Sequence, residues 1–187
     1  MLLRKQLESI SQAYPRHQQW AYLERLAQYN EHTIRPVADP WPEYNYTCLV
    51  FALGLTNSRV YQQIVTRNED VFAGPEFALF LISQGALETV TKPQCGDLVL
   101  YSTSHERHYE ICHAGLIEED GKVISKWGLG GLWQHETFEL PANYGKHASY
   151  YAATDPERIL NWFLKFARSR GADNARPRFK INDIKEA

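Results

Sequence analysis

The spacing of the hydrophobic residues changes from helical to strand-like near residue 90 of this chain. Before that point the spacing is helical over 2–13 and 17–31, which Pro15 separates, and then over about 47–55, 58–68 and 75–84. From residue 96 onward, short apolar runs predict a strand at 96–102, a hairpin at 112–128 around Glu-Glu-Asp-Gly, and a last strand at 147–153. Helices followed by an antiparallel sheet predict an α+β fold.

Two segments lie outside this simple order. Residues 32–46 carry three prolines and are expected to form an extended surface segment. A further helix is predicted from Pro156 to Arg168, so the chain divides into a main domain, 1–155, and a C-terminal helix with a basic tail, 156–187. The tail region carries a net charge of +4 against −6 for the rest, which is typical of a solvated tail and, less often, of a partner site.

Composition excludes several classes of protein. The chain has 187 residues, of which 44% are hydrophobic and 13% aromatic, enough for a substantial core. Its net charge of −2 gives no indication of nucleic-acid binding, and no apolar run is long enough to predict a membrane span. The first residues lack the apolar stretch of a secretory signal, so we expect a cytoplasmic protein, although an effector delivered by a secretion system would look the same.

Cys48 is the residue on which a functional interpretation depends. Thr47 before it is a good N-cap, which places Cys48 at the first position of the predicted helix. Free backbone N–H groups and the helix dipole at that position favour the thiolate, so we expect a lowered thiol pKa. The alternative is an inert core cysteine; the three cysteines, Cys48, Cys95 and Cys112, form no disulfide framework.

A nucleophilic cysteine needs a base, and His113 is the best placed of the seven histidines. It begins the apolar strand "HAGLI", where Ala114 and Gly115 leave room beside its ring. A lone histidine at a strand start is usually structural. A cysteine at a helix start, then "GDLVLY", then "HAGLI" is a more specific order.

These residues resemble the NlpC-like branch of the papain-like cysteine peptidases and amidases, with the CHAP amidases as more distant relatives. The resemblance covers about residues 40–152 and rests on Cys48 in "YNYTCLVFAL", Gly96-Asp97 in "CGDLVLY" and His113 in "HAGLIEEDGKVIS". It implies helices packed on a small antiparallel sheet, with Cys48 as nucleophile and His113 as base. Leu49 stands where wall peptidases often have serine or tryptophan, so their substrate does not carry over.

The resemblance also implies an oxyanion site and a third residue that orients the base. The backbone N–H of Cys48 would bind the oxyanion with a second donor from Tyr44, Asn45 or Tyr46. The position for the orienting residue falls at Ser125, and His135 could replace it if the chain folds back. Both alternatives stay open at this point.

The expected function is therefore hydrolysis of an amide bond through a Cys48–His113 pair and a covalent acyl-enzyme. Two alternatives remain: a catalytically inactive papain-like binding module, and an acyltransferase or deamidase that uses the same pair. We expect a peptide or protein substrate, no cofactor and no metal, and a possible immunity or regulatory protein as partner if the chain is a bacterial toxin.

Overall fold

The computed structural model describes residues 2–37, 46–68, 70–104, 110–128 and 130–172. Within these residues the helices are α1 (Leu2–Ala13), α2 (Arg16–Ala27), α3 (Cys48–Ala52), α4 (Arg59–Arg67), α5 (Pro75–Ser83), the short 3-10 helix η1 (Ala142–Tyr144) and α6 (Pro156–Ser169). The strands are β1 (Arg35–Val37), β2 (Leu98–Ser102), β3 (Ile111–Ile117), β4 (Val123–Lys126), β5 (Leu132–His135) and β6 (His147–Tyr151). The predicted α+β class is confirmed.

The strands form one antiparallel sheet in the order β1-β5-β4-β3-β2-β6. β3 lies at its centre, between β2 and β4, so both neighbours fix its register. Tyr101 of β2 lies opposite His113, and Ser125 of β4 lies opposite Gly115. Because side chains alternate between the faces of a strand, His113, Tyr101 and Ser125 share one face of the sheet, and Ala114 faces the other.

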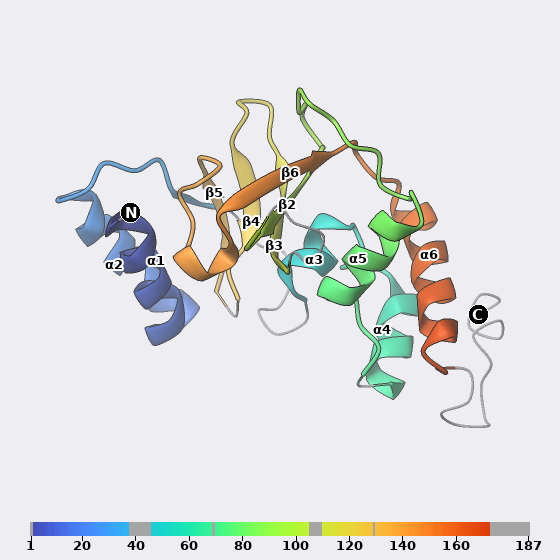
Figure 1. Cartoon of the computed structure of the whole chain (residues 1–187). Coiled ribbons are helices and arrows are strands. Elements are labelled where there is room, and N and C mark those ends of the chain that lie inside the picture. The colour runs from blue at the N-terminus through green and yellow to red at the C-terminus, as the bar shows by residue number, and fades with distance from the viewer. Residues whose placement is uncertain (1, 38–45, 69, 105–109, 129, 173–187) are drawn as a thin grey trace.

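Helices cover both faces of the sheet (Figure 1). On one side, α3 to α6 enclose a core that includes Leu49, Phe77 and Phe163 together with Leu100 and Ala114 of the sheet. On the other side, α1 and α2 enclose a second core that includes Leu7 and Leu23 together with Val99, Tyr101 and Trp133. The sheet therefore separates two hydrophobic clusters, and residues at its centre are buried from both sides.

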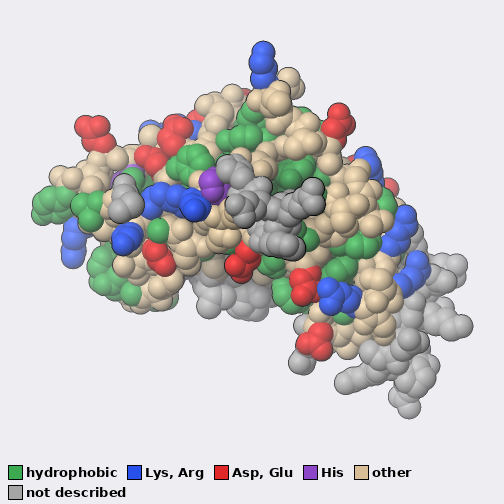
Figure 2. Space-filling model, in the orientation of Figure 1, with side chains coloured by type: hydrophobic (Ala, Val, Ile, Leu, Met, Phe, Trp, Pro, Cys, Tyr) green, Lys and Arg blue, Asp and Glu red, His purple; other side chains and the backbone are tan. Residues whose placement is uncertain are grey.

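The C-terminal helix α6 belongs to the first of these cores. The ring of Phe163 packs edge-on against Tyr61 of α4 and Phe77 of α5, at centroid distances of 4.8 and 5.3 Å. In the described part of the chain, none of the helices combines the length and hydrophobicity that crossing a bilayer requires. Figure 2 shows acidic and basic side chains interspersed over the face turned to the viewer.

Several elements differ from the sequence-based expectations or add to them, and α3 ends at Ala52, before the expected end near residue 55. The segment expected to be extended contains β1, which pairs with β5 through Arg35 and Gln134. The second helix ends at Ala27 instead of continuing to residue 31. The sequence does not predict β5 as a strand: the chain folds back after β4, as the His135 alternative requires, and this antiparallel pairing places His135 opposite Val123.

Candidate active site

Cys48 is the first residue of α3, as predicted. Thr47 caps the helix: its backbone is extended, and its hydroxyl accepts a hydrogen bond of 3.4 Å from the N–H of Val50. The buried residues Leu49, Val50 and Ala52 hold the helix in the core. This short helix packs against β3 and β4, so its N-terminus and the thiol lie beside the centre of the sheet.

The expectation of a lowered thiol pKa at Cys48 is wrong in this structure. Burial of the sulfur raises the pKa to about 11, although part of the residue stays exposed. Two effects lower the thiol pKa but are smaller than the effect of burial. They are hydrogen bonding to the backbone of Ala114, Leu49 and Cys48, and the positive charge of Lys126. The resting sulfur is therefore a protonated thiol at neutral pH.

His113 lies deep in the sheet, with 1% of its surface exposed. Its ring stacks on Tyr144, with centroids 4.1 Å apart and planes inclined by 12°, and lies 5.7 Å from the ring of Tyr101. Burial, and then the charge of His135, hold its pKa well below the ordinary histidine value. The buried Nε2 atom has no hydrogen-bond partner among the described residues, which leaves a neutral imidazole with a free nitrogen.

Backbone contacts bring the elements carrying Cys48 and His113 together. The Cys48 sulfur is within hydrogen-bonding reach of the backbone of Ala114, the residue after His113. Tyr144 lies near both residues. Its ring stacks on His113. Burial raises the pKa of its hydroxyl most, and the nearby Cys48 charge raises it further. No hydrogen bond joins the thiol to the imidazole within the described residues.

Ser125 and His135, the two candidates for orienting the base, are bonded to each other. The Ser125 hydroxyl lies 2.8 Å from Nε2 of His135 and accepts a bond of 3.1 Å from the indole N–H of Trp127. Nδ1 of His135 lies 2.7 Å from the carbonyl oxygen of Glu136. This buried network shares the face of the sheet with His113, but no bond from it to the His113 ring is present in the described structure.

Lys126 is a buried cation beside the thiol. Its side chain is fully buried, its ammonium donates a hydrogen bond to the carbonyl of Gly130, and it lies 4.9 Å from the centre of the Tyr46 ring. Lys126 follows Ser125 in β4 and therefore points to the opposite face, toward α3. Its charge favours the thiolate of Cys48.

The remaining candidates differ in what can be said of them. Tyr46 is buried, and its ring lies 6.4 Å from that of Phe51. Tyr44 and Asn45 lie outside the described residues. Sequence reasoning missed Tyr144 and the role of Lys126; alternation along β4 is the signal that could have placed Lys126 beside α3, whereas nothing local marks Tyr144.

Comparisons of this chain with models of protein families, with curated proteins and with solved structures give no significant match. Among the described residues, no group of three or more histidine, cysteine, aspartate or glutamate side chains is arranged to hold a metal ion. The functional interpretation therefore depends on the chemistry of the side chains around Cys48 and His113.

Proposed function

We propose that this protein is a cysteine hydrolase of papain-like, NlpC-like fold that cleaves an amide bond in a peptide or protein. One observation carries the proposal. The thiol at the capped start of α3 lies against the backbone of Ala114 in β3, and the residue before Ala114 is His113, whose buried Nε2 has no bonding partner among the described residues. An unsatisfied polar atom in a core costs stability, so it calls for an explanation, and a catalytic role is one such explanation.

The protonation states favour a general-base mechanism over a resting ion pair. The Cys48 thiol has a pKa of about 11 and the pKa of His113 is lowered, so both groups are neutral at neutral pH. As the sulfur attacks the substrate carbonyl carbon, a C–S bond forms, the thiol proton moves to His113, and the carbonyl electron pair moves to oxygen. Collapse of this intermediate breaks the C–N bond, and His113 returns the proton to the leaving amine. Water then hydrolyses the thioester.

Positive electrostatic potential near Cys48 would stabilise both anions of this reaction. The unpaired N–H groups at the start of α3 would donate to the carbonyl oxygen as it becomes negative. The buried ammonium of Lys126 adds a full positive charge on the same side of the sheet, where water screens it little. Lys126 thus favours the thiolate of Cys48 and would stabilise an oxyanion formed beside it.

An acyl-transfer assay tests the proposal without knowledge of the natural substrate. The chain is incubated with p-nitrophenyl acetate, release of nitrophenolate is followed, and the acetylated cysteine is identified by peptide mass spectrometry. We expect acetylation of Cys48 followed by turnover, with both lost in Cys48→Ala and His113→Ala. Cys95→Ser is the matched control, because Cys95 is exposed and can react without a base.

A second candidate, a non-catalytic binding module of the same fold, is favoured by the raised pKa of the thiol and by the lack of a Cys48–His113 hydrogen bond in the described structure. The same assay separates the two. In a binding module, the exposed Cys95 would be acetylated, Cys48 would stay unmodified, and the rate of nitrophenolate release would be the same in His113→Ala as in wild type.

A further inference from the structure

We propose that helix α1 holds the imidazole of His113 in its working orientation through two positioning residues, Arg4 and Tyr144. This inference rests on the proposed role of His113 as the base. It assigns a role in the site to the N-terminal helices, which lie outside residues 40–152, the part of the chain that resembles the peptidases.

The first link is the stack between Tyr144 and His113. A histidine ring turns easily about its last torsion, so hydrogen bonds to its nitrogens usually fix its plane. Nε2 of His113 has no such bond among the described residues. The nearly parallel Tyr144 ring, 4.1 Å away, covers the imidazole instead and restricts its rotation. The same ring face would also stabilise the imidazolium formed when His113 takes a proton.

The second link joins Tyr144 to α1. The guanidinium of Arg4 donates to the carbonyl oxygens of Leu140 at 3.1 Å and Pro141 at 3.3 Å, and also to that of Gly145. These three carbonyls flank the η1 turn that carries Tyr144. Arg4 also lies over the ring of Phe138, 5.8 Å from its centre. One side chain of α1 therefore holds both ends of the turn.

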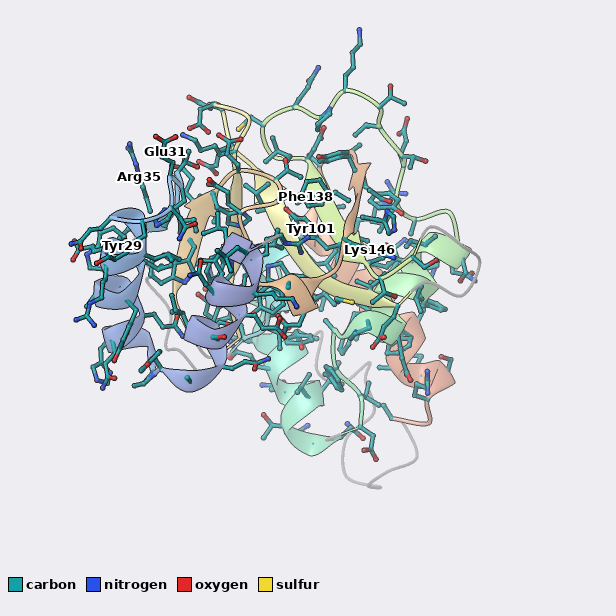
Figure 3. All side chains as sticks on the ribbon, turned by 60° about the vertical axis from the view of Figure 1, so that its left-hand side comes forward. Tyr29, Glu31, Arg35, Tyr101, Phe138 and Lys146 are labelled. Atoms are coloured by element: carbon teal, nitrogen blue, oxygen red, sulfur yellow. The ribbon has the colours of Figure 1, made fainter. Side chains whose placement is uncertain are left out.

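The third link fixes the turn against the sheet. The N–H of Lys146 donates to the carbonyl of Ser102 in β2 at 2.9 Å, so the chain after Tyr144 is bonded to the strand beside β3. Figure 3 shows Tyr101 and Phe138 side by side in this region, with Lys146 nearby, and their rings lie 6.3 Å apart. In Figure 1 the η1 turn lies between α1 and the sheet. Tyr144 is thus held from both sides while its ring faces His113.

A buried tyrosine beside a histidine is more often simple packing, so the test needs a readout that packing alone does not move. Protons of the His113 ring that lie over the Tyr144 ring experience its ring current, which displaces their NMR resonances upfield. The variants Tyr144→Phe, Tyr144→Leu and Arg4→Met are compared with wild type, both in this shift and in the rate of Cys48 acetylation by p-nitrophenyl acetate.

We expect Tyr144→Phe to keep the upfield shift and most of the acetylation rate, because the ring is preserved. Tyr144→Leu loses the shift and lowers the rate by roughly 10- to 100-fold with little change in KM, the size of effect expected from a misplaced base. Arg4→Met reduces both, but adds no further loss of rate in the Tyr144→Leu background, since the two residues act in series.

Arg25→Met is the matched control. Arg25 lies on α2 and contacts an aromatic ring, Tyr22 at 5.6 Å, in the same manner as Arg4, but no bond from it to the η1 turn is present in the described structure. The Arg25→Met variant should show the same upfield shift of the His113 ring protons and the same rate of Cys48 acetylation as wild type. Unchanged shift and rate in Tyr144→Leu would overturn the positioning role alone. A normal shift in a wild-type chain that never acetylates Cys48 would overturn the proposed function instead.

Discussion

The hydroxyl of Ser125 and Nε2 of His135 lie 2.8 Å apart between two buried strands and hydrogen-bond to each other. A single assignment of protons satisfies the whole network: Trp127 donates to Ser125, Ser125 donates to His135, and Nδ1 of His135 donates to the carbonyl of Glu136. Ser125 and His135, the two candidates for orienting the base, thus bond to each other and to Trp127 and Glu136, and these bonds use the nitrogens and hydroxyl that could otherwise bind His113.

Ser125→Ala should lower the free energy of unfolding by about 2–3 kcal/mol. The substitution removes the partner of both the Trp127 N–H and the His135 Nε2, and leaving buried polar groups unpaired is costly. Urea unfolding monitored by tryptophan fluorescence measures the loss. Ser83→Ala is the control, because the Ser83 hydroxyl is exposed on α5 and bonds only the carbonyl of Phe80. Equal losses in the two variants would contradict the network.

The free energy of unfolding should decrease as the pH is lowered, and this decrease should be smaller in His135→Asn than in wild type. Burial lowers the pKa of His135 from 6.5 to about 4, so between these values the unfolded chain binds a proton that the folded chain does not. Stability therefore rises with pH across this window, and protonation of the unfolded state costs about 3 kcal/mol as pH falls from 6.5 to 4.

The free energy of unfolding is measured at several values of pH. The result is the slope of this free energy against pH, because the substitution can also change its absolute value. His135→Asn should show a shallower slope than wild type, and the slope that remains includes the contribution of His113, whose pKa burial also lowers. His17→Asn, which replaces an exposed histidine of α2, is the matched control for the substitution itself. Parallel curves for wild type and His135→Asn would show that His135 titrates alike in the folded and unfolded chains.

Much of the fold could be predicted because its signals are local. The helical spacing of 2–13 gives the bounds of α1, and Thr47 fixes the start of α3 through its capping bond. The turn at Gly96-Asp97 uses a similar local bond: Asp97 accepts from the N–H of Gln94 within the turn, and also from the N–H of Ala153. By contrast, β1 spans only three residues, of which Pro36 is one, and it is mostly exposed, so only its pairing with β5 defines it.

The candidate site could be predicted only in part, because its electrostatics depend on burial. The position of Cys48 at a helix start is local and correctly placed, but the thiol pKa is set by the sheet that covers the sulfur. Likewise, the stack of Tyr144 on His113 joins residues 31 positions apart through a turn of three residues. No periodicity in the sequence encodes that contact.

Gly145→Ala should destabilise the η1 turn more than a surface glycine substitution does. Gly145 has φ of +104°, and an added Cβ would lie 2.8 Å from the backbone N and O of Ser102. Strain and displacement together should cost about 2 kcal/mol or more. Gly121→Ala is the control: its φ is +79°, but a Cβ there meets nothing within 4 Å, so only the cost of about 1 kcal/mol for the backbone applies. Urea unfolding compares the two, and equal losses would mean that the turn moves freely from β2.

The last prediction concerns the reactivity of the thiol. A rise in the pKa of Cys48 from 9.0 to about 11 lowers the thiolate fraction at pH 7 by about 100-fold, and the greater nucleophilicity of a more basic thiolate recovers about tenfold. Iodoacetamide should therefore alkylate Cys48 at least about tenfold more slowly than the exposed Cys95, as peptide mass spectrometry can quantify within one sample.

The charge of Lys126 gives this prediction a second test. Because the ammonium favours the thiolate, Lys126→Met should slow alkylation of Cys48 further, by about three- to fourfold for each unit by which the pKa rises, and leave Cys95 unaffected. Lys122→Met is the control: Lys122 pairs with Asp120 at 3.0 Å in the β3–β4 hairpin turn. If Cys48 instead reacts fastest of the three cysteines near neutral pH, its sulfur rests as a thiolate, and the helix start and Lys126 together outweigh burial.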